Sequence, residues 1–438
     1  MFGKPALIVL VLSVLCLPYT RSLTRLVRVL GFFREKNSTI VQDPSHLIFI
    51  NDTIQCEDIH FEEESGKIFL ACEDSYEGRF EWFPPLANFH NPSLAAESTG
   101  SIHVVDPESK KSQRLKFVNF RGPFNTHGID VIPDHESTEA AVYIFVVNHP
   151  PDLAKCPDAM DLKGCKANAA SRIEIFHHVI GSDVATHLRS VQHPLISTPN
   201  DILARNPHSF YVTNDHYYKE GALRFFEVVF WGAKWSTTVF IELDSLTSTD
   251  TTADVNARVA ASGIHNQNGL GRGRSGEILI GCAGSGVLKV GKASSENPAI
   301  QFVSSIKLDS TIDNPSYFRD PYANSTFDAS GYILAGLSRA ADLPKTTTDP
   351  NGNDGSMVWY VPSRQGAEES STMSPRLLFE DDGQRIRFAT AAVMVAVDPK
   401  LEDGQRWAWL FVTGAFAKGV LAVKINLENA VQGTLWTL

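Results

Sequence analysis

Short apolar runs separated by turn residues dominate the chain. The clearest runs lie at 67–73, 101–106, 141–149, 172–179, 209–216, 238–243, 277–291, 300–308, 332–337, 357–362 and 407–425. They are rich in β-branched and aromatic residues and are bounded by Gly, Asn, Asp and Pro, which is typical of β-strands. No long segment carries the 3.6-residue period of an amphipathic helix. The pattern predicts an all-β protein.

Several runs share one plan, in which a buried run, a turn of small residues and a more amphipathic strand follow one another. The segments at 276–292 and 406–425 show this plan most clearly. It is typical of the middle strands of propeller blades. The units recur every roughly 50–70 residues, which gives about six blades over this length. We predict a single six-bladed β-propeller over 41–438. An array of β-sandwiches is the competing architecture, although no linker-like stretch divides the chain.

The N-terminus predicts entry into the secretory pathway. An apolar run at 6–17 follows Lys4; it is too short to span a bilayer and fits the core of a signal peptide. Residues 1–20 are therefore a signal peptide or a retained anchor. Residues 21–40 are a basic amphipathic segment, either a helix that lies on a membrane surface or a disordered leader. Its arginines at helical spacing are Arg21, Arg25 and Arg28.

Sequons and cysteines agree with that compartment. Glycosylation sequons begin at Asn37, Asn51 and Asn324. Cys56 and Cys72 flank two strand-like segments and would lie opposite each other in a hairpin, and Cys156 and Cys165 bracket a short polar stretch. Connectivity does not follow from sequence, so both disulfides are hypotheses.

The net charge of −11 argues against a nucleic-acid partner, and no basic face with interleaved aromatic residues occurs.

Acidic and amide side chains stand beside several predicted strands. The clusters are Glu57–Asp58, Asn200–Asp201, Asn266 with Asn268, and Asp313–Asn314. Such residues either start turns or bind a cation, because an unpaired carboxylate beside an apolar strand is costly. In a propeller the innermost strand of every blade lines the central channel, so the clusters would converge there. Carboxylate and amide oxygens without sulfur or imidazole favour calcium over zinc.

Two histidines are candidates for proton transfer. His127 precedes Gly128 ahead of a predicted strand, and His149 stands at the end of a buried run. A lone buried histidine is normally a hydrogen-bonded core residue. Two histidines near a metal-bearing channel are a candidate acid–base pair, because imidazole titrates near neutral pH.

Together these motifs resemble the paraoxonase/arylesterase family. The segments EDIHF, THGIDVIPD, VYIFVVNHP and TPNDILARNPHSFYVTNDHYY, followed by NGL and DN, occur in that family's order and setting. The resemblance extends over roughly residues 50–430. It implies a six-bladed propeller with two calcium ions in its central tunnel.

The resemblance also implies a role for each matched residue. The catalytic calcium would be held by Glu57, Asn200, Asn268, Asp313 and Asn314. The structural calcium would be held by Asp58, Asp201 and the backbone oxygen of Ile129. His127 and His149 match the proposed dyad, and Tyr76 falls near the active-site loop. The family's disulfide between the N-terminal region and the C-terminal end has no counterpart, because no cysteine follows Cys282. Closure of the ring must therefore differ.

The expected function is calcium-dependent hydrolysis of lactones and aryl esters, with phosphotriesters as promiscuous substrates. His127, tuned by His149, is the expected general base, with Asp313 or Glu57 as the alternative. The expected location is secreted or lumenal, with peripheral membrane contact through the N-terminal segment. Two other functions stay open. One is a non-catalytic, calcium-stabilised propeller that binds a partner, as in some strictosidine-synthase-like proteins. The other is a gluconolactonase-like enzyme that uses carboxylates without a histidine pair.

Overall fold

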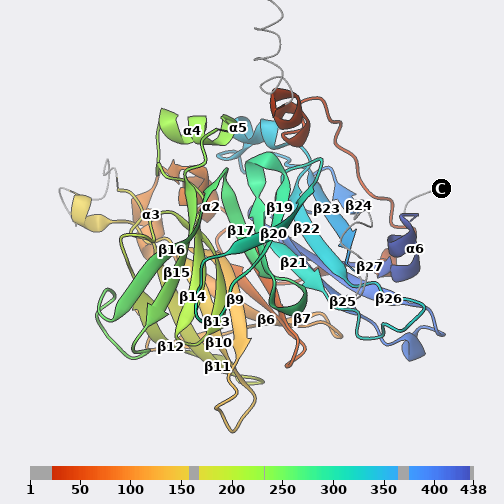
Figure 1. Ribbon diagram of the computed structural model, residues 1–438, viewed down its shortest axis with the longest axis horizontal. Coiled ribbons are helices and arrows are strands. Elements are labelled where there is room, and N and C mark those ends of the chain that lie inside the picture. Colours follow the sequence, from red (N-terminus) through yellow and green to blue (C-terminus); the bar gives the residue numbers. More distant parts are fainter. Residues whose placement is uncertain (1–21, 157–166, 231, 364–373, 435–438) are drawn as a thin grey trace, which may run out of the picture.

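The computed structural model describes residues 22–156, 167–230, 232–363 and 374–434. Its strands form six sheets of four or five strands, together with one two-stranded ribbon (Figure 1). Each larger sheet is one blade, which confirms the predicted all-β, six-bladed propeller. Cys165 and the predicted leader at 1–20 lie outside the described residues.

The first three blades come from the N-terminal half of the chain. Blade 1 contains β2 (Cys56–Glu62), β3 (Lys67–Cys72), β6 (Ser101–Asp106) and β7 (Lys111–Arg114). Blade 2 contains β9 (Thr126–Pro133), β10 (Ala141–Asn148), β11 (Arg172–Val179), β12 (Val184–Val191) and β8 (Lys116–Val118), which pairs parallel with β12. Blade 3 contains β13 (Pro199–Asn206), β14 (Ser209–Asn214), β15 (Ser236–Leu243) and β16 (Val255–Ile264).

The C-terminal half supplies the remaining blades. Blade 4 contains β17 (Gln267–Arg272), β18 (Ile278–Cys282), β19 (Val287–Lys292) and β20 (Gln301–Lys307). Blade 5 contains β21 (Pro315–Phe318), β22 (Gly331–Leu337), β23 (Ser356–Pro362) and β24 (Arg376–Asp381). Blade 6 contains β25 (Ala389–Ala396), β26 (Trp407–Gly414), β27 (Val420–Asn426) and β1 (Leu47–Ile50).

The first strand of each blade faces the axis of the propeller. Strands β2, β9, β13, β17, β21 and β25 contact one another in that order, and β25 returns to β2. They therefore form a closed ring around the central channel. The hydrophobic core lies between neighbouring blades, because each blade buries both faces against the next one.

The N-terminal strand β1 closes the ring. It pairs antiparallel with β27, with Leu47 opposite Val423 and Ile50 opposite Val420. Blade 6 is thus completed by residues from the opposite end of the described chain. This pairing holds the two ends together through backbone hydrogen bonds. The sequence had indicated only that the disulfide expected from the resemblance has no counterpart here.

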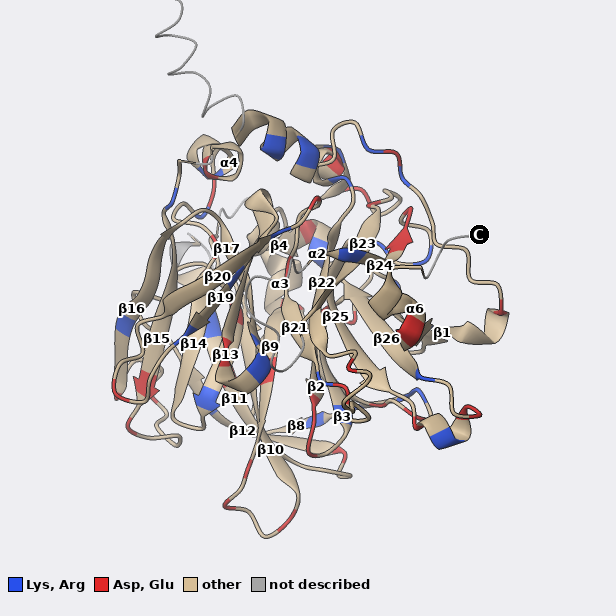
Figure 2. Cartoon of the chain, turned by 45° about the vertical axis from the view of Figure 1, so that its right-hand side comes forward, with Lys and Arg blue, Asp and Glu red and all other residues tan. Residues whose placement is uncertain are grey.

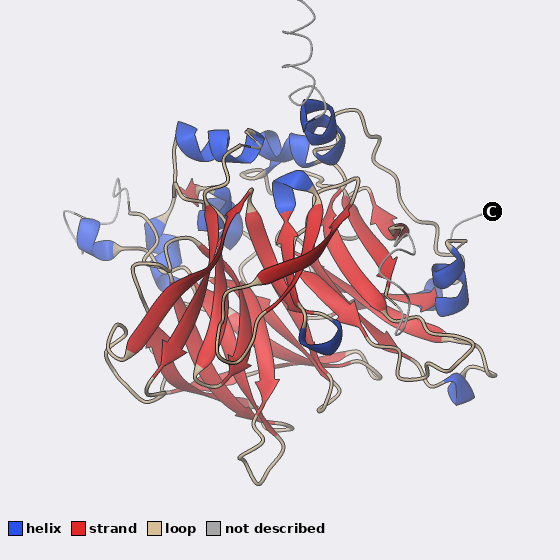
Figure 3. Ribbon diagram, in the orientation of Figure 1, coloured by secondary structure: helices blue, strands red, loops and turns tan. Residues whose placement is uncertain are grey.

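Several short helices, α4 and α5 among them, gather at one end of the propeller, whereas α6 lies at its side next to β27 (Figures 1 and 3). The labelled α-helices are α2 (Gly78–Glu81), α3 (Pro92–Glu97), α4 (Ala222–Val229), α5 (Leu343–Thr346) and α6 (Leu427–Gln432). The 3-10 turns are η1 (Pro44–His46), η2 (Pro84–Leu86), η3 (Leu153–Lys155), η4 (Arg274–Gly276), η5 (Ala283–Ser285), η6 (Ala340–Asp342) and η7 (Pro399–Leu401). The ribbon of β4 (Trp82–Phe83) and β5 (Asn88–Phe89) lies beside α2.

Residues 22–29 form a helix that is docked on the propeller. Arg25 donates hydrogen bonds to the backbone oxygens of Ser285 and Gly286 at 2.8 and 2.9 Å, and Val29 is fully buried. Figure 2 shows basic segments in this helix at the end of the molecule that carries α4. These residues form a helix that packs on the fold and are not a disordered leader. Arg25 donates hydrogen bonds to the protein's own carbonyl groups.

The predicted hairpin disulfide is present. Cys56 and Cys72 are opposite each other in the β2–β3 pair and form a disulfide bond. Cys156 is also disulfide-bonded, and its predicted partner lies outside the described residues. Cys282 is a buried free thiol.

Candidate metal centre and active site

The predicted ligands and His127 come from five of the six inner strands or from the two residues just before such a strand, whereas His149 follows β10. Glu57 and Asp58 lie on β2, His127 and Ile129 on β9, Asn200 and Asp201 on β13, and Asn268 on β17, while Asp313 and Asn314 immediately precede β21. The sixth inner strand, β25, contributes Thr390, whose hydroxyl donates to the backbone oxygen of Glu57.

Contacts between distant segments show that these residues meet. Asn314 donates from Nδ2 to Glu57 Oε1 at 3.3 Å, and His127 Nε2 lies 3.7 Å from the same oxygen. Asn314 also packs against Gly269, where an added Cβ would lie 2.3 Å from Asn314 Oδ1. A side chain at position 269 would therefore displace the amide. Glu57, Asn314 and the residue that follows Asn268 are therefore brought together, beside His127.

The oxygens of this set lack hydrogen-bond partners. Within the described part of the chain, the buried side-chain oxygens without any partner include one from each predicted ligand: Glu57 Oε2, Asn200 Oδ1, Asn268 Oδ1, Asp313 Oδ1 and Asn314 Oδ1. An unsatisfied buried acceptor costs about 1–3 kcal/mol. A cation that is coordinated by these five oxygens would remove that cost for each of them.

The charges at the site also call for a cation. Burial raises the pKa of Glu57 well above its usual value, and the nearby carboxylates of Asp313 and Asp58 raise it further. Burial and the charges of Asp58 and Asp215 likewise raise the pKa of Asp313. Two carboxylates in one buried space cannot both ionise cheaply without a countercharge.

Asp58 and Asp201 form the second predicted group. Asp58 Oδ2 accepts from the Ile129 N–H at 2.8 Å, and Asp201 Oδ2 accepts from the Leu270 N–H at 2.6 Å. Burial raises the pKa of Asp58 to about 6 and, together with the charge of Asp58, raises that of Asp201. Gly128 makes room for this pair, because an added Cβ there would lie 2.5 Å from Asp201 Oδ1.

Neighbouring residues of a pair face different spaces. Asp58 lines a cavity of about 340 Å³ formed by the later residues of the inner strands, whereas Glu57 does not line it. Glu57 instead faces His127. The side chains of Glu57 and Asp58 therefore point into different spaces.

His127 and His149 form the predicted contact. His149 Nε2 lies 3.2 Å from His127 Nδ1, and His149 Nδ1 lies 2.8 Å from the hydroxyl of Ser171. Burial, followed by the nearby charges of His149 and Arg79, lowers the pKa of His127 well below its usual value. Burial lowers the pKa of His149 to about 3. Burial thus favours the neutral form of both rings, which is the form that can accept a proton.

The second Asn–Asp pair of blade 3 has a supporting role. Asn214 Oδ1 accepts from the backbone N–H groups of Ser197 and Thr198 at 2.8 and 3.0 Å, which fixes the turn leading into Asn200. Asp215 lies 3.0 Å from His216 and 3.8 Å from Arg224. Turn chemistry thus accounts for Asn214, while Asn200 faces the channel.

Sequence reasoning missed Arg79, which is 1% exposed. Its guanidinium donates to the backbone oxygen of Gln55 and to the Thr126 hydroxyl, at 3.1 and 3.3 Å. It thereby links the residues next to the β2 and β9 site groups. It also lies over the ring of Phe83, whose edge meets His127 at 5.3 Å. No motif marks Arg79 in the sequence, because it acts through contacts with backbone groups.

The donor set fits calcium better than a transition metal. Three of the five oxygens come from amides and two from carboxylates, and calcium accepts such mixed oxygen sets in flexible geometry. Among the described residues there is no group of three or more His, Cys, Asp or Glu side chains arranged to hold a metal. A site of that kind would suit zinc, whereas this one depends on amide oxygens.

Residues 86–270 match the sequence model of the family described as arylesterase. Serum paraoxonase/arylesterase 2 of Gallus gallus is 30% identical over 182 residues, which are 41% of this chain and 42% of that protein. Serum paraoxonase/lactonase 3 of Homo sapiens is 29% identical over 154 residues, which are 34% of this chain and 37% of that protein. The chain thus matches about two fifths of the length of these curated relatives.

Solved structures of similar architecture are more distant in sequence. A luciferin-regenerating enzyme is 12% identical with a TM-score of 0.43, and the match covers 86% of this chain and 94% of that one. The segment matched by the family model includes His127, His149 and Asn200, whereas Glu57 and Asp313 lie outside it. For Glu57 the support comes from its contacts with Asn314 and His127, and for Asp313 from the effect of its charge on the pKa of Glu57.

Proposed function

We propose that this chain, whose residues 86–270 match the arylesterase family model, is a paraoxonase-like, calcium-dependent hydrolase of lactones and aryl esters. The observation that supports the proposal is that five buried oxygens of the proposed ligands, from four blades, have no hydrogen-bond partner, while His149 Nε2 lies 3.2 Å from His127 Nδ1. A non-catalytic propeller has no need of such a histidine pair, and a gluconolactonase-like site that uses carboxylates alone also lacks it.

The residues divide into two groups of ligands. Glu57, Asn200, Asn268, Asp313 and Asn314 would hold the catalytic calcium, and Asp58, Asp201 and the Ile129 backbone oxygen would hold the structural one. Calcium at the first position supplies positive charge that polarises the substrate carbonyl and stabilises the oxyanion. The protein supplies a fixed, desolvated set of oxygens, so that little reorganisation is needed when charge develops.

His127 would accept a proton from the attacking water. Its Nε2 faces Glu57 and the channel, while Nδ1 faces His149. The aromatic edge of Phe83 covers the ring, and this apolar wall limits the access of bulk water. Asp313 or Glu57 is the alternative base. Phosphotriesters, in which negative charge also develops on oxygen, are proposed as promiscuous substrates.

The test is an assay of the purified protein with phenyl acetate, a panel of aliphatic lactones and a phosphotriester, before and after calcium removal. We expect ester and lactone turnover that is lost with a calcium chelator and restored by added calcium. Turnover that survives complete calcium removal would refute calcium catalysis. A protein that binds calcium tightly and hydrolyses none of the panel would favour the binding-module function.

The same end of the propeller carries exposed apolar side chains suited to a membrane surface. Phe33, just after the docked helix, is 91% exposed, and Leu223 and Phe225 on α4 are 52% and 63% exposed. Figure 3 shows that the docked helix and α4 lie at the same end. No helix in the described ranges is long and apolar enough to cross a membrane. We therefore propose a secreted or lumenal protein with peripheral membrane contact at this end.

Vesicle sedimentation tests this contact. Replacing Phe33 and Phe225 together with Ser should weaken binding to phospholipid vesicles. Replacing Leu401, which is 78% exposed in η7, with Ser should leave it unchanged. If both variants bind vesicles as well as the parent protein does, Phe33 and Phe225 do not form a membrane-binding surface.

A further inference from the structure

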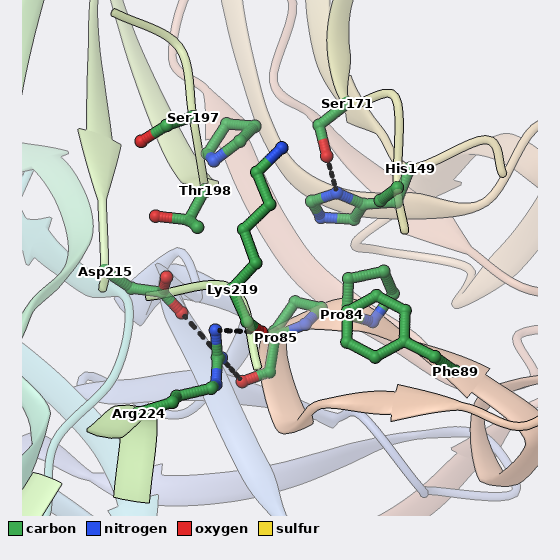
Figure 4. Close-up of a pocket in the computed structure, with 12 residues that line it drawn as sticks. Pro84, Pro85, Phe89, His149, Ser171, Ser197, Thr198, Asp215, Lys219 and Arg224 are labelled. Atoms are coloured by element: carbon green, nitrogen blue, oxygen red, sulfur yellow. Dashed lines mark hydrogen bonds and ion pairs between the residues drawn. The ribbon is translucent and has the colours of Figure 1, made fainter. Parts of the chain in front are cut away.

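Ser171 and His149 face each other at the ends of two neighbouring strands. The β10–β11 ladder ends with Asn148 opposite Arg172, and His149 and Ser171 are the next residues on either side. The distance from His149 Nδ1 to Ser171 Oγ is 2.8 Å (Figure 4). The main chain of His149 is also fixed, because its carbonyl accepts from Trp82 Nε1 at 2.8 Å and its N–H donates to the Asn125 carbonyl at 2.9 Å.

His127, His149 and Ser171 form a row of hydrogen-bonding groups. The position of the hydrogen on one ring nitrogen fixes its position on the others. A neutral imidazole has one N–H donor and one acceptor nitrogen. If His127 Nε2 is to accept a proton from water, His127 Nδ1 must carry hydrogen and donate to His149 Nε2. His149 Nδ1 must then carry hydrogen and donate to Ser171 Oγ. The reverse order would place hydrogen on His127 Nε2 and remove it as a base.

A small pocket adjoins the outer end of the row. Its volume is about 20 Å³, and its lining includes His149, Ser171, Thr198, Asp215, Lys219 and Arg224. Figure 4 shows His149 and Ser171 together on one side of it and the Asp215–Arg224 pair on another. This volume suffices for one water molecule, and the polar lining offers the hydrogen bonds that a buried water requires.

We propose that Ser171 is a positioning residue that holds His149 as the Nδ1–H tautomer and connects the histidine pair to water in this pocket. The proposal rests on the proposed function. In this arrangement the proton leaves the histidine pair through His149, on the side that faces away from the proposed ligand oxygens.

The transfer balances atom by atom. As water adds to the carbonyl, one of its protons moves to His127 Nε2, and the Nδ1 proton of His127 moves to His149 Nε2. The Nδ1 proton of His149 moves to Ser171 Oγ, whose own proton passes to the pocket water. The pocket water in turn releases one proton to the solvent. Each of His127, His149, Ser171 and the pocket water therefore gains one proton and gives one up, so no charge remains on either buried ring.

The first test compares Ser171→Ala with Ser171→Thr. The alanine variant should lower kcat about 10- to 100-fold with KM unchanged, because orientation of the base is lost while substrate contacts remain. The threonine variant keeps a hydroxyl and should recover most of kcat. Ser182→Ala is a matched control, because the Ser182 hydroxyl also lies near a histidine of this blade, at 3.4 Å from His178 Nδ1.

The second test needs no activity. Nitrogen-15 NMR of histidine-labelled protein, with His149 assigned by substitution, should show a protonated Nδ1 and an unprotonated Nε2 in the parent protein. In Ser171→Ala this preference should be lost. An unprotonated Nδ1 in the parent protein, or an alanine variant with unchanged kcat, would overturn the proposal. Absence of turnover in the parent protein would refute the proposed function instead, and the NMR result would still test the tautomer.

Discussion

Asn314 donates a hydrogen bond to Glu57 across 257 positions of sequence, and in doing so turns its own Oδ1 away from any protein partner. The same amide therefore positions one proposed ligand and presents another. Asn314 is itself held by its backbone N–H, which donates to the Thr390 carbonyl at 2.9 Å. Blades 1, 5 and 6 thus meet at this one residue.

Replacing Glu57 with Gln should weaken calcium binding and abolish ester turnover. The substitution keeps the shape but removes one of two charged ligands, and the affinity loss should exceed the roughly 10- to 100-fold cost of losing an outer-shell partner. Titration calorimetry measures the affinity. Glu242→Gln is the control, because Glu242 forms an exposed ion pair with Arg258 at 3.0 Å. Unchanged calcium affinity in Glu57→Gln would remove Glu57 from the ligand set.

Replacing His127 with Gln should lower kcat for lactones by about 10²–10⁴-fold, the usual contribution of a general base. Calcium content should stay the same, since His127 is not among the proposed ligands. Steady-state kinetics and metal analysis on the same sample separate the two effects. Full turnover in this variant would transfer the role of base to Asp313 or Glu57. His135→Gln, on an exposed loop residue, provides the control.

Removing the hairpin disulfide should destabilise the protein by about 3 kcal/mol, since the bond links residues that are 16 positions apart. The double variant Cys56→Ala, Cys72→Ala shows this as a lower midpoint of urea unfolding. Cys282→Ala removes a buried thiol that forms no disulfide, so it should cost less, about 1 kcal/mol. Equal losses for the two changes would mean that packing, and not the crosslink, matters at Cys56 and Cys72.

The middle strands of the blades can be predicted from sequence, because they are buried and carry a strong apolar signal. The predicted runs at 101–106 and 172–179 coincide with β6 and β11, whereas none of the predicted runs covers one of the six inner strands. Several outer strands were missed because they are exposed. Strand β7 is largely exposed with the sequence KSQR, and β16 alternates between exposed and partly buried residues. Such edge strands have no apolar pattern to detect.

The proposed ligands could be singled out because acidic and amide side chains are unusual at strand starts, whereas the residues that support them carry no such signal. Ser171 meets His149 only because β10 and β11 pair. The sequence alone does not show which residues of these two strands lie opposite each other. The closure of the ring by β1 is equally hidden, since any short apolar strand could pair with β27. Arg25 carried an ambiguous signal, because a guanidinium suits lipid phosphate and backbone carbonyl oxygens alike.

Replacing Glu73 with Gln should make the protein's stability less dependent on pH. Glu73 is buried beside Arg79, and burial raises its pKa from the usual 4.5 to about 7, against the opposing charge of Arg79 and the Ser98 hydrogen bond. The folded protein therefore holds this proton more tightly than the unfolded chain. Stability from Glu73 is complete below about pH 4.5 and declines as the pH rises to about 7.

The difference between the two values corresponds to at most about 3 kcal/mol. Relative to the parent protein, Glu73→Gln should therefore gain up to that amount of unfolding free energy between pH 4.5 and 8, with calcium kept saturating. Glutamine retains acceptors for Ser98 but has no proton to lose in this range. Urea unfolding at several pH values measures the difference. A gap between variant and parent that stays constant with pH would mean that Glu73 is ionised in the folded protein throughout, with Arg79 neutralising it.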